Sequence, residues 1–245
     1  NLAIQRIQGL YNDEQSFIPS IENQGLEWEN PTKLFWGIDI DLENHSETVE
    51  YHSSAKFPHA GIGVLRNYNC ENKEEHGLMG FIGGAHYVHS HLTGIEMELY
   101  GSGMVMGAGS GDPKATSARS SDVYRNYHRI YAGHNTVIIN GDSKGTHPGS
   151  WKWDNILYQD KSEIIGIEPN INMDQTNSDG PFYPVSNNFS FVTVELDDNV
   201  NDALQQRTLS IIRTSDETGY YLDIFRSKSN ELNNFHDYIY HNYGE

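Results

Sequence analysis

The chain has 245 residues, with 16 Lys and Arg against 34 Asp and Glu, which gives a formal net charge of −18 and a sequence pI of about 4.9. This excess of acid argues against a protein that binds nucleic acids or anionic membranes, because both tasks need clustered Lys and Arg facing phosphate groups. With 36% apolar and 11% aromatic residues, the composition is typical of a globular protein and not of a disordered acidic chain.

A single cysteine, Cys70, excludes intramolecular disulfides and cysteine-rich zinc sites, so any bound metal must use His and carboxylate ligands. No apolar run approaches the roughly 20 residues needed to cross a bilayer. The sequence opens at Asn1 without an initiator Met or a signal segment. We therefore expect either a processed product or an excised piece of a longer protein.

Residues 1–46 contain Pro19, Pro31 and scattered aromatic residues without alternation, which predicts a connecting segment from a preceding domain. From residue 47 onward, short runs rich in β-branched and aromatic residues are separated by clusters of Gly, Asn, Asp and Ser, and helical periodicity is almost absent. The pattern predicts an all-β antiparallel domain over residues 47–245, with strands at residues 48–53, 61–67, 78–83, 95–100, 136–140, 163–167, 189–196, 208–213 and 220–226. Asn140-Gly141 and the stretch 216–219 predict tight turns.

Three histidines are concentrated in residues 83–94, which read Gly-Gly-Ala-His-Tyr-Val-His-Ser-His-Leu-Thr-Gly. In a strand, residues two apart share a face, so His89 and His91 would project together, a spacing that suits a metal or an anionic group. Histidines satisfied within a sheet are an equally good interpretation of such a pair alone.

Residues 111–134 form a basic island, with four cations against two acids, so the stretch carries +2 and the remainder −20. Arginine forks in such an island can hold carboxylate or sulfate groups, although ordinary surface ion pairing is the more common interpretation. If the island does hold such anionic groups, Arg119, Arg125, Arg129 and Asn135 are our candidates for binding them. For Tyr124, Tyr127 and Tyr131 we favour core packing over stacking on sugars.

Taken together, these segments resemble the β-sandwich domain of heparinase II/III-like polysaccharide lyases. The resemblance rests on the His-x-His strand followed by Leu-Tyr-Gly-x-Gly, on Tyr-x-x-x-x-Ala-x-His-Asn-Thr-Val and on the Asn-Gly turn after it. It covers roughly residues 34–243 and implies a large antiparallel sandwich of the supersandwich type that follows a helical (α/α) toroid absent from this chain. It also implies that His89 is the active-site histidine and that His91 and His134 are two ligands of a structural zinc or another divalent cation.

The sequence departs from the family where an acidic turn is common, because residues 106–111 read Met-Gly-Ala-Gly-Ser-Gly. The expected carboxylate ligand is thus missing near Gly107 or Ala108, and Asp112 is the nearest acid. Two imidazoles alone make a weak metal site.

We therefore expect part of a secreted or periplasmic lyase that cleaves an acidic, uronate-containing polysaccharide, such as ulvan, alginate or a glycosaminoglycan, by β-elimination. The catalytic Tyr and the group that neutralises the uronate would come from the toroid domain or from another chain. The sandwich itself can be incomplete at its C-terminal end. The alternative is a non-catalytic carbohydrate-binding or structural sandwich whose histidines pack together or hold a metal.

Overall fold

The computed structural model describes residues 54–58, 60–84, 91–109, 122–142, 162–169, 184–198 and 201–242, excluding the side chain of Arg125. All of these residues fall in one compact unit, His52–Glu245. The predicted connecting segment 1–46 and the predicted strand at residues 48–53 lie outside the described residues.

Antiparallel strands dominate the described chain, as the sequence predicted. In chain order they are β1 (Ala55–Phe57), β2 (Ile62–Asn67), β3 (Leu78–Gly83), β4 (Glu96–Gly101), β5 (Met104–Gly107), β6 (Val137–Ile139), β7 (Glu163–Glu168), β8 (Phe189–Asp198), β9 (Ala203–Arg213), β10 (Gly219–Ser229) and β11 (His236–Tyr238). The helical elements are short: α4 (Lys73–His76), the π-helical turn η4 (Tyr124–His128) and the 3-10 turn η5 (Tyr131–Gly133). Within the described ranges, no helix has the length and hydropathy needed to span a bilayer.

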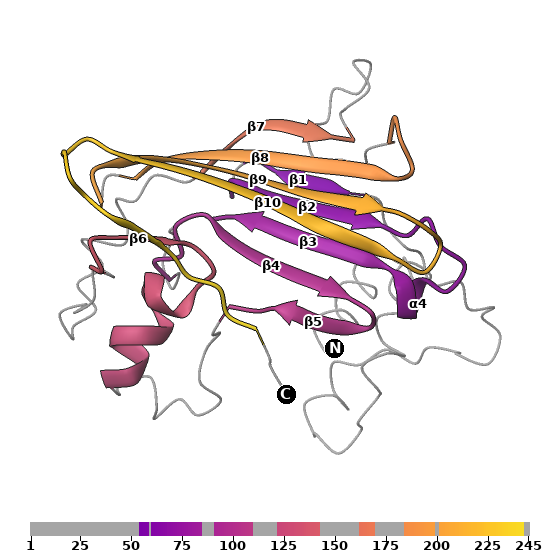
Figure 1. Cartoon of the computed structure of the whole chain (residues 1–245), viewed down its shortest axis with the longest axis horizontal. Coiled ribbons are helices and arrows are strands. Elements are labelled where there is room, and N and C mark those ends of the chain that lie inside the picture. Colours follow the sequence, from indigo (N-terminus) through magenta and orange to yellow (C-terminus); the bar gives the residue numbers. More distant parts are fainter. Residues whose placement is uncertain are drawn as a thin grey trace, which may run out of the picture. The chain divides into compact units, whose positions relative to one another are not determined.

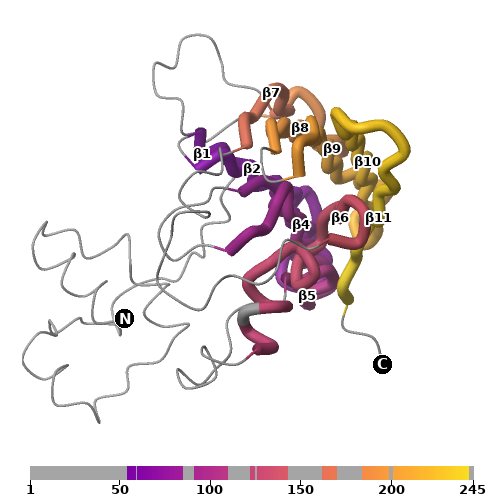
Figure 2. The backbone as a smooth tube through the Cα atoms, turned by 90° about the vertical axis from the view of Figure 1, so that its left-hand side faces the viewer, coloured from indigo at the N-terminus to yellow at the C-terminus, as the bar shows by residue number. Residues whose placement is uncertain are grey.

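The strands form two large sheets and one small one (Figure 1). The first sheet has the order β1-β2-β3-β4-β5, the second has the order β10-β9-β8-β7, and β11 pairs with β6. Figure 2 shows β7 to β10, in orange to yellow, alongside β1 to β5, in indigo to magenta. The predicted antiparallel β-sandwich is thereby confirmed.

The core of the sandwich comes from strands in which alternate residues are buried. In β2 and β3 the burial repeats with period two, so that Leu65 and Ile82 point inward with the buried Val192 and Leu209 of the second sheet. The full set of buried core residues is Leu65, Leu78, Ile82, Ile95, Met97, Leu99, Ile167, Val192, Val194, Leu196, Leu209 and Ile211. Because both sheets contribute to one cluster, the apolar face of each sheet is covered by the other.

Two glycines allow the sheets to approach closely. A Cβ placed on Gly63 would lie 2.5 Å from Cγ2 of Val192, and one on Gly80 would lie 2.7 Å from Cδ2 of Leu209. Both distances are shorter than a carbon contact permits, so a side chain at either position would push the sheets apart.

Both predicted turns are confirmed. Asn140 and Gly141 adopt positive φ values of 57° and 64°, and the backbone N–H of Asp142 donates to the carbonyl of Ile139, as a two-residue hairpin turn requires. The stretch 214–218 closes the hairpin between β9 and β10 through the N–H of Thr214, which donates to the carbonyl of Thr218 at 3.0 Å.

Among the residues that the structure describes, Arg207, on β9, has the largest side chain that is completely buried. Its guanidinium forms a two-pronged ion pair with Asp223 of β10, with both N···O distances at 2.8 Å. It also donates to the carbonyls of Ile95 and Asn135 and to the hydroxyl of Tyr238. Arg207 therefore connects both strands of the β9–β10 hairpin to the start of β4 and to the segment before β6.

A second buried arginine, Arg213, makes a similar connection at the C-terminal end of β9. It donates to the side-chain oxygen of Asn67 at 2.8 Å and to the carbonyl of His76, which closes α4. Charged side chains thus add to the apolar packing: Arg213 ties β9 to the first sheet through Asn67, and Arg207 ties the middle of β9 to the segment before β4.

Strands β1, β5 and β11 and all three helical turns were not predicted. Strands β1 and β11 have three residues each, and β5 has four, too few to establish an alternation. Strands β9 and β10 are longer than predicted, because residues 203–207 of β9 and 227–229 of β10, most of them polar, continue the pairing.

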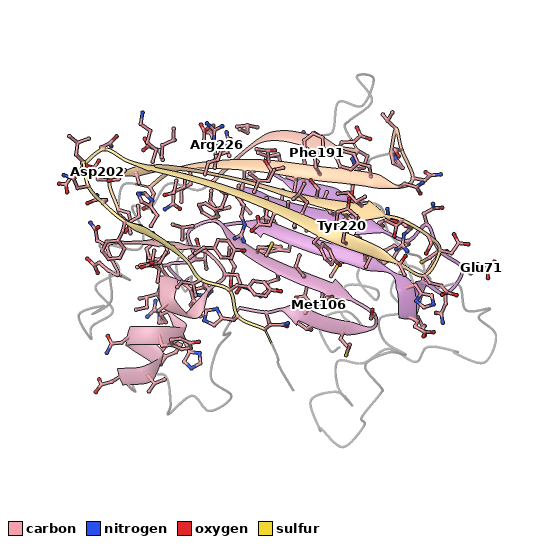
Figure 3. The ribbon with its side chains drawn as sticks, viewed as in Figure 1. Glu71, Met106, Phe191, Asp202, Tyr220 and Arg226 are labelled. Carbon is pink, nitrogen blue, oxygen red and sulfur yellow. The ribbon has the colours of Figure 1, made fainter. Side chains whose placement is uncertain are left out.

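We expect Arg207→Met to lower the free energy of unfolding by about 3–5 kcal/mol, the usual loss when one partner of a buried ion pair is removed. The loss arises because Asp223 would lose its ion pair, keeping the hydrogen bond from Tyr238, and two main-chain carbonyls would lose the guanidinium as a donor. Denaturant titration measures this change. Arg226→Met is the matched control: Arg226 is exposed on β10 (Figure 3) and bonds to Gln206, and its loss should cost within about 0.5 kcal/mol. Equal losses in the two variants would contradict this role for Arg207.

Candidate functional site

The structure brings together two of the predicted site residues, His91 and His134. Their ring centroids lie 5.4 Å apart, with the ring planes tilted by 56°. His89 and Arg119 lie outside the described residues, and only the backbone of Arg125, within η4, is described. The roles of these three residues therefore stay predictions.

His91 and His134 are positioned by a small hydrophobic cluster separate from the sandwich core. Next to His91, Leu92 is buried with Ile130, Tyr131 and Ile138. The backbone N–H of Leu92 donates to the carbonyl of Arg129 at 2.9 Å, which ties the histidine segment to the end of η4. His134 follows η5 directly and leads in extended conformation toward β6.

Glu96, at the start of β4, is a site residue that the sequence analysis missed. Its Oε1 lies 2.7 Å from Nδ1 of His134, and both side chains are nearly buried, with 10% and 4% of their surface exposed. Nε2 of the same imidazole is buried and has no hydrogen-bond partner among the described residues. The signal in the sequence was the acidic pair Glu96 and Glu98 on one face of a predicted strand close to the histidine motif.

The turn after β5 approaches the same carboxylates. The backbone N–H of Gly109 donates to Oε1 of Glu98 at 3.2 Å, and a Cβ on Gly109 would lie 2.2 Å from Oε1 of Glu96. A side chain at position 109 would therefore displace the carboxylate of Glu96 from this place. Where the sequence lacks the expected acid near Gly107 or Ala108, carboxylates from β4 reach this turn instead.

The arrangement supplies two imidazoles suited to a divalent cation. A buried imidazole nitrogen without a hydrogen-bond partner, as at Nε2 of His134, fits a metal ligand. Zinc sites take three or four protein ligands, and no group of three His, Cys, Asp or Glu that could hold a metal occurs in the described ranges. Further ligands would have to come from elsewhere in the protein or from solvent.

The side chain of Asn135, which the sequence predicted to bind substrate, makes hydrogen bonds in the interior, and its part in substrate binding stays a prediction. This side chain is completely buried, donates to the carbonyl of Met97 at 2.9 Å and accepts from the backbone N–H of His241. The amide is thus engaged within the protein, where it joins β4 to the segment after β11.

A rim of aromatic and imidazole rings surrounds the histidine pair. The ring of Tyr124 meets that of His91 edge to face at 6.1 Å, and the guanidinium carbon of Arg129 lies 5.7 Å from the Tyr124 centroid. Tyr127 is 37% exposed and packs edge to face against His241 at 5.9 Å. The prediction of core packing is confirmed for Tyr124 and Tyr131, which are buried, whereas Tyr127 has a surface that a ligand could reach.

The electrostatics of the rim favour a neutral imidazole at His241. Burial lowers the pKa of His241 below the usual value for histidine, and the neighbouring His134 lowers it further. On β4, burial and the hydrogen bond to Glu98 raise the pKa of Tyr100, so the Tyr100 hydroxyl stays protonated at neutral pH.

We expect Asn135→Ala to lower the free energy of unfolding by about 2–4 kcal/mol, because each buried polar group left without its partner costs about 1–3 kcal/mol. The two groups are the carbonyl of Met97 and the N–H of His241. Thermal or denaturant unfolding measures the change. Asn126→Ala, at an exposed position in η4, should stay within about 0.5 kcal/mol of the parent. A loss in Asn135→Ala no larger than in this control would be incompatible with a structural role for Asn135.

One relative with a described activity matches this chain along its whole length. The chain is 49% identical over 245 residues to an endo-acting ulvan lyase from Formosa agariphila, and the match covers all of this chain but 29% of that protein. The chain therefore spans less than a third of its relative. No family model matches the sequence. The predicted resemblance to a polysaccharide lyase is confirmed by this relative.

Among solved structures, two of a heparinase III gene product, one with methylated lysines, match 96% of this chain and 39–40% of theirs. Their sequence identities to this chain are 13% and 14%, with TM-scores of 0.40 and 0.41.

Proposed function

We propose that this chain is the sandwich part of a lyase that cleaves an acidic, uronate-containing polysaccharide by β-elimination, with ulvan as the first candidate substrate. The observation that carries the proposal is the 49% identity to an endo-acting ulvan lyase along the whole chain. The geometry supports it, because a histidine pair, an exposed tyrosine and an arginine are gathered at one place.

Elimination at a uronate requires three contributions. The charge of the carboxylate must be neutralised, a base must remove the proton beside it, and an acid must protonate the leaving oxygen. His89 is our candidate for the base or for a hydrogen-bond donor to the carboxylate, because an imidazole titrates near neutral pH. His89 precedes His91 by two residues, and the ring of His91 lies beside that of His134.

The remaining contributions come from outside this chain in our proposal. A helical toroid domain, or another chain, would supply the catalytic Tyr and the group that neutralises the carboxylate. The relative is more than three times as long as this chain, which leaves room for such a domain. Because polymeric substrates of this kind lie outside the cytoplasm, we propose a secreted or periplasmic protein.

Arg129, together with Arg119 and Arg125, would hold the carboxylate or sulfate groups of the polymer. A guanidinium presents paired donors that match the two oxygens of a carboxylate. Arg129 is half-buried at the end of η4, and its guanidinium lies over the ring of Tyr124, which orients the cation.

A zinc or another divalent cation would be held by Nε2 of His134 and by His91. Such an ion would cross-link the segment before β4 to the segment before β6 and add a positive charge close to the anionic substrate. The protein's own contribution is to keep Nε2 of His134 buried and directed away from Glu96.

The lyase assignment is tested with the complete protein that carries this chain. Incubation with ulvan should produce unsaturated uronates, whose formation is measured by their ultraviolet absorbance. His89→Ala should lower kcat about a hundred- to ten-thousandfold, the usual contribution of general acid or base catalysis. His236→Ala is the control, since His236 lies on β11 and bonds to Ser227, and its activity should be unchanged. An unchanged kcat in His89→Ala would contradict a catalytic role for His89. Binding of ulvan without any product would favour a non-catalytic carbohydrate-binding module.

Arg129→Ala should weaken substrate binding and lower kcat/KM roughly ten- to hundredfold, the loss expected for one charged hydrogen bond. Steady-state kinetics at low and high salt measure the effect, which should shrink as salt screens the polymer charge. The matched control is again Arg226, whose replacement by Ala removes an exposed cation from β10 of the second sheet. An equal change in both variants would mean that Arg129 has no specific contact with the substrate.

Zinc at a hundredfold excess over its dissociation constant should raise the free energy of unfolding by about 2.7 kcal/mol, and a chelator should reverse the gain. His134→Ala should abolish this response, whereas His236→Ala should keep it. Melting temperatures with and without zinc measure the difference. A parent protein whose melting temperature does not respond to zinc or to other divalent cations contradicts the proposed metal site.

A further inference from the structure

We propose that Glu96 is a positioning residue that holds His134 in the Nδ1–H tautomer and thereby presents Nε2 to the site. The consequence for metal binding rests on the proposed function above, whereas the tautomer itself does not. No motif in the sequence assigned a role to Glu96.

The contact between Glu96 and His134 decides which nitrogen carries the proton. A carboxylate accepts hydrogen bonds and donates none, so the 2.7 Å contact requires a proton on Nδ1. A proton on Nε2 would be buried without an acceptor among the described residues. Both observations favour the neutral tautomer that has its lone pair on Nε2, which is the form that binds metals.

The surroundings hold the two partners in this geometry from several sides. The guanidinium of Arg207 binds the carbonyl of Ile95, which precedes Glu96, and the carbonyl of Asn135, which follows His134. Gly109 leaves the space that Oε1 of Glu96 occupies. Because one side chain fixes the backbone next to each partner, the distance between carboxylate and imidazole is set by the fold and not by chance rotation of Glu96.

Glu98 provides an internal comparison. It lies two residues further along β4, on the same face, and its carboxylate accepts from the hydroxyl of Tyr100 at 2.6 Å and from the N–H of Gly109. The two glutamates therefore share a strand and a face. We assign the tautomer of His134 to Glu96, because the carboxylate of Glu96 is the one that contacts Nδ1 of His134.

The test uses nitrogen NMR of the metal-free chain labelled at histidine, with the His134 signals assigned by their absence in His134→Gln. We expect a protonated Nδ1 and an unprotonated Nε2 in the parent. Glu96→Ala should lose this preference, Glu96→Gln should retain part of it because the amide oxygen can still accept, and Glu98→Ala should match the parent. Finding Nε2–H in the parent overturns the proposal without any variant. Equal tautomer ratios in Glu96→Ala and the parent would also overturn it.

The metal arm measures zinc affinity by competition with a chelator in the same proteins. Loss of a partner that orients a ligand typically weakens binding ten- to hundredfold, and we expect this for Glu96→Ala but not for Glu98→Ala. A parent with the expected tautomer that binds no zinc would contradict the proposed metal site and still support the assignment of Glu96. An unchanged zinc affinity in Glu96→Ala would overturn the claim that Glu96 prepares the ligand.

Discussion

The completely buried guanidinium of Arg207 is the constraint on which the sandwich and the site both depend. A charge in the interior is tolerated when it is paired and when its other donors are satisfied. Arg207 meets these conditions through Asp223, two main-chain carbonyls and Tyr238, while the ring of Phe225 lies 5.2 Å from the guanidinium carbon. These partners come from four different segments of the chain. The guanidinium is therefore satisfied only when all four segments are in their native places.

This arrangement also determines where the site can form. The carbonyls that bind Arg207 belong to the neighbours of Glu96 and His134, which places the carboxylate and the imidazole within hydrogen-bond distance. Asn135 adds a second tie, because its amide joins β4 to the segment after β11. Arg207 and Asn135, which stabilise the fold, thus lie next to Glu96 and His134, which form the candidate site. We therefore expect a substitution in either pair to affect both stability and the geometry of the site.

Alternation of apolar residues predicted β2, β3, β4 and β8 to within a few residues, because each of these strands buries one face against the opposite sheet. The same rule could not find β1 or β11, whose three residues pair at sheet margins. The π-helical turn η4 has no apolar repeat, since Tyr124 is its one buried side chain among those described. Its closing hydrogen bond, from Arg129 to Tyr124, is a tertiary outcome that spacing does not show.

For the site, motif resemblance paired His91 with His134 across more than forty residues, and the structure brings these rings together. It could not find Glu96 or Arg207, because their roles come from distances between segments that are far apart in sequence. It also gave no sign that the side chain of Asn135 is buried, since a motif does not show the burial of a polar side chain.

Our central claim is that the complete protein eliminates across a uronate linkage and does not hydrolyse it. Mass spectrometry of the fragments released from ulvan tests this claim most directly. The account predicts fragments with an unsaturated uronate at the new non-reducing end, each lighter by one water than the corresponding hydrolysis product. Saturated fragments, or intact polymer after binding, would contradict it.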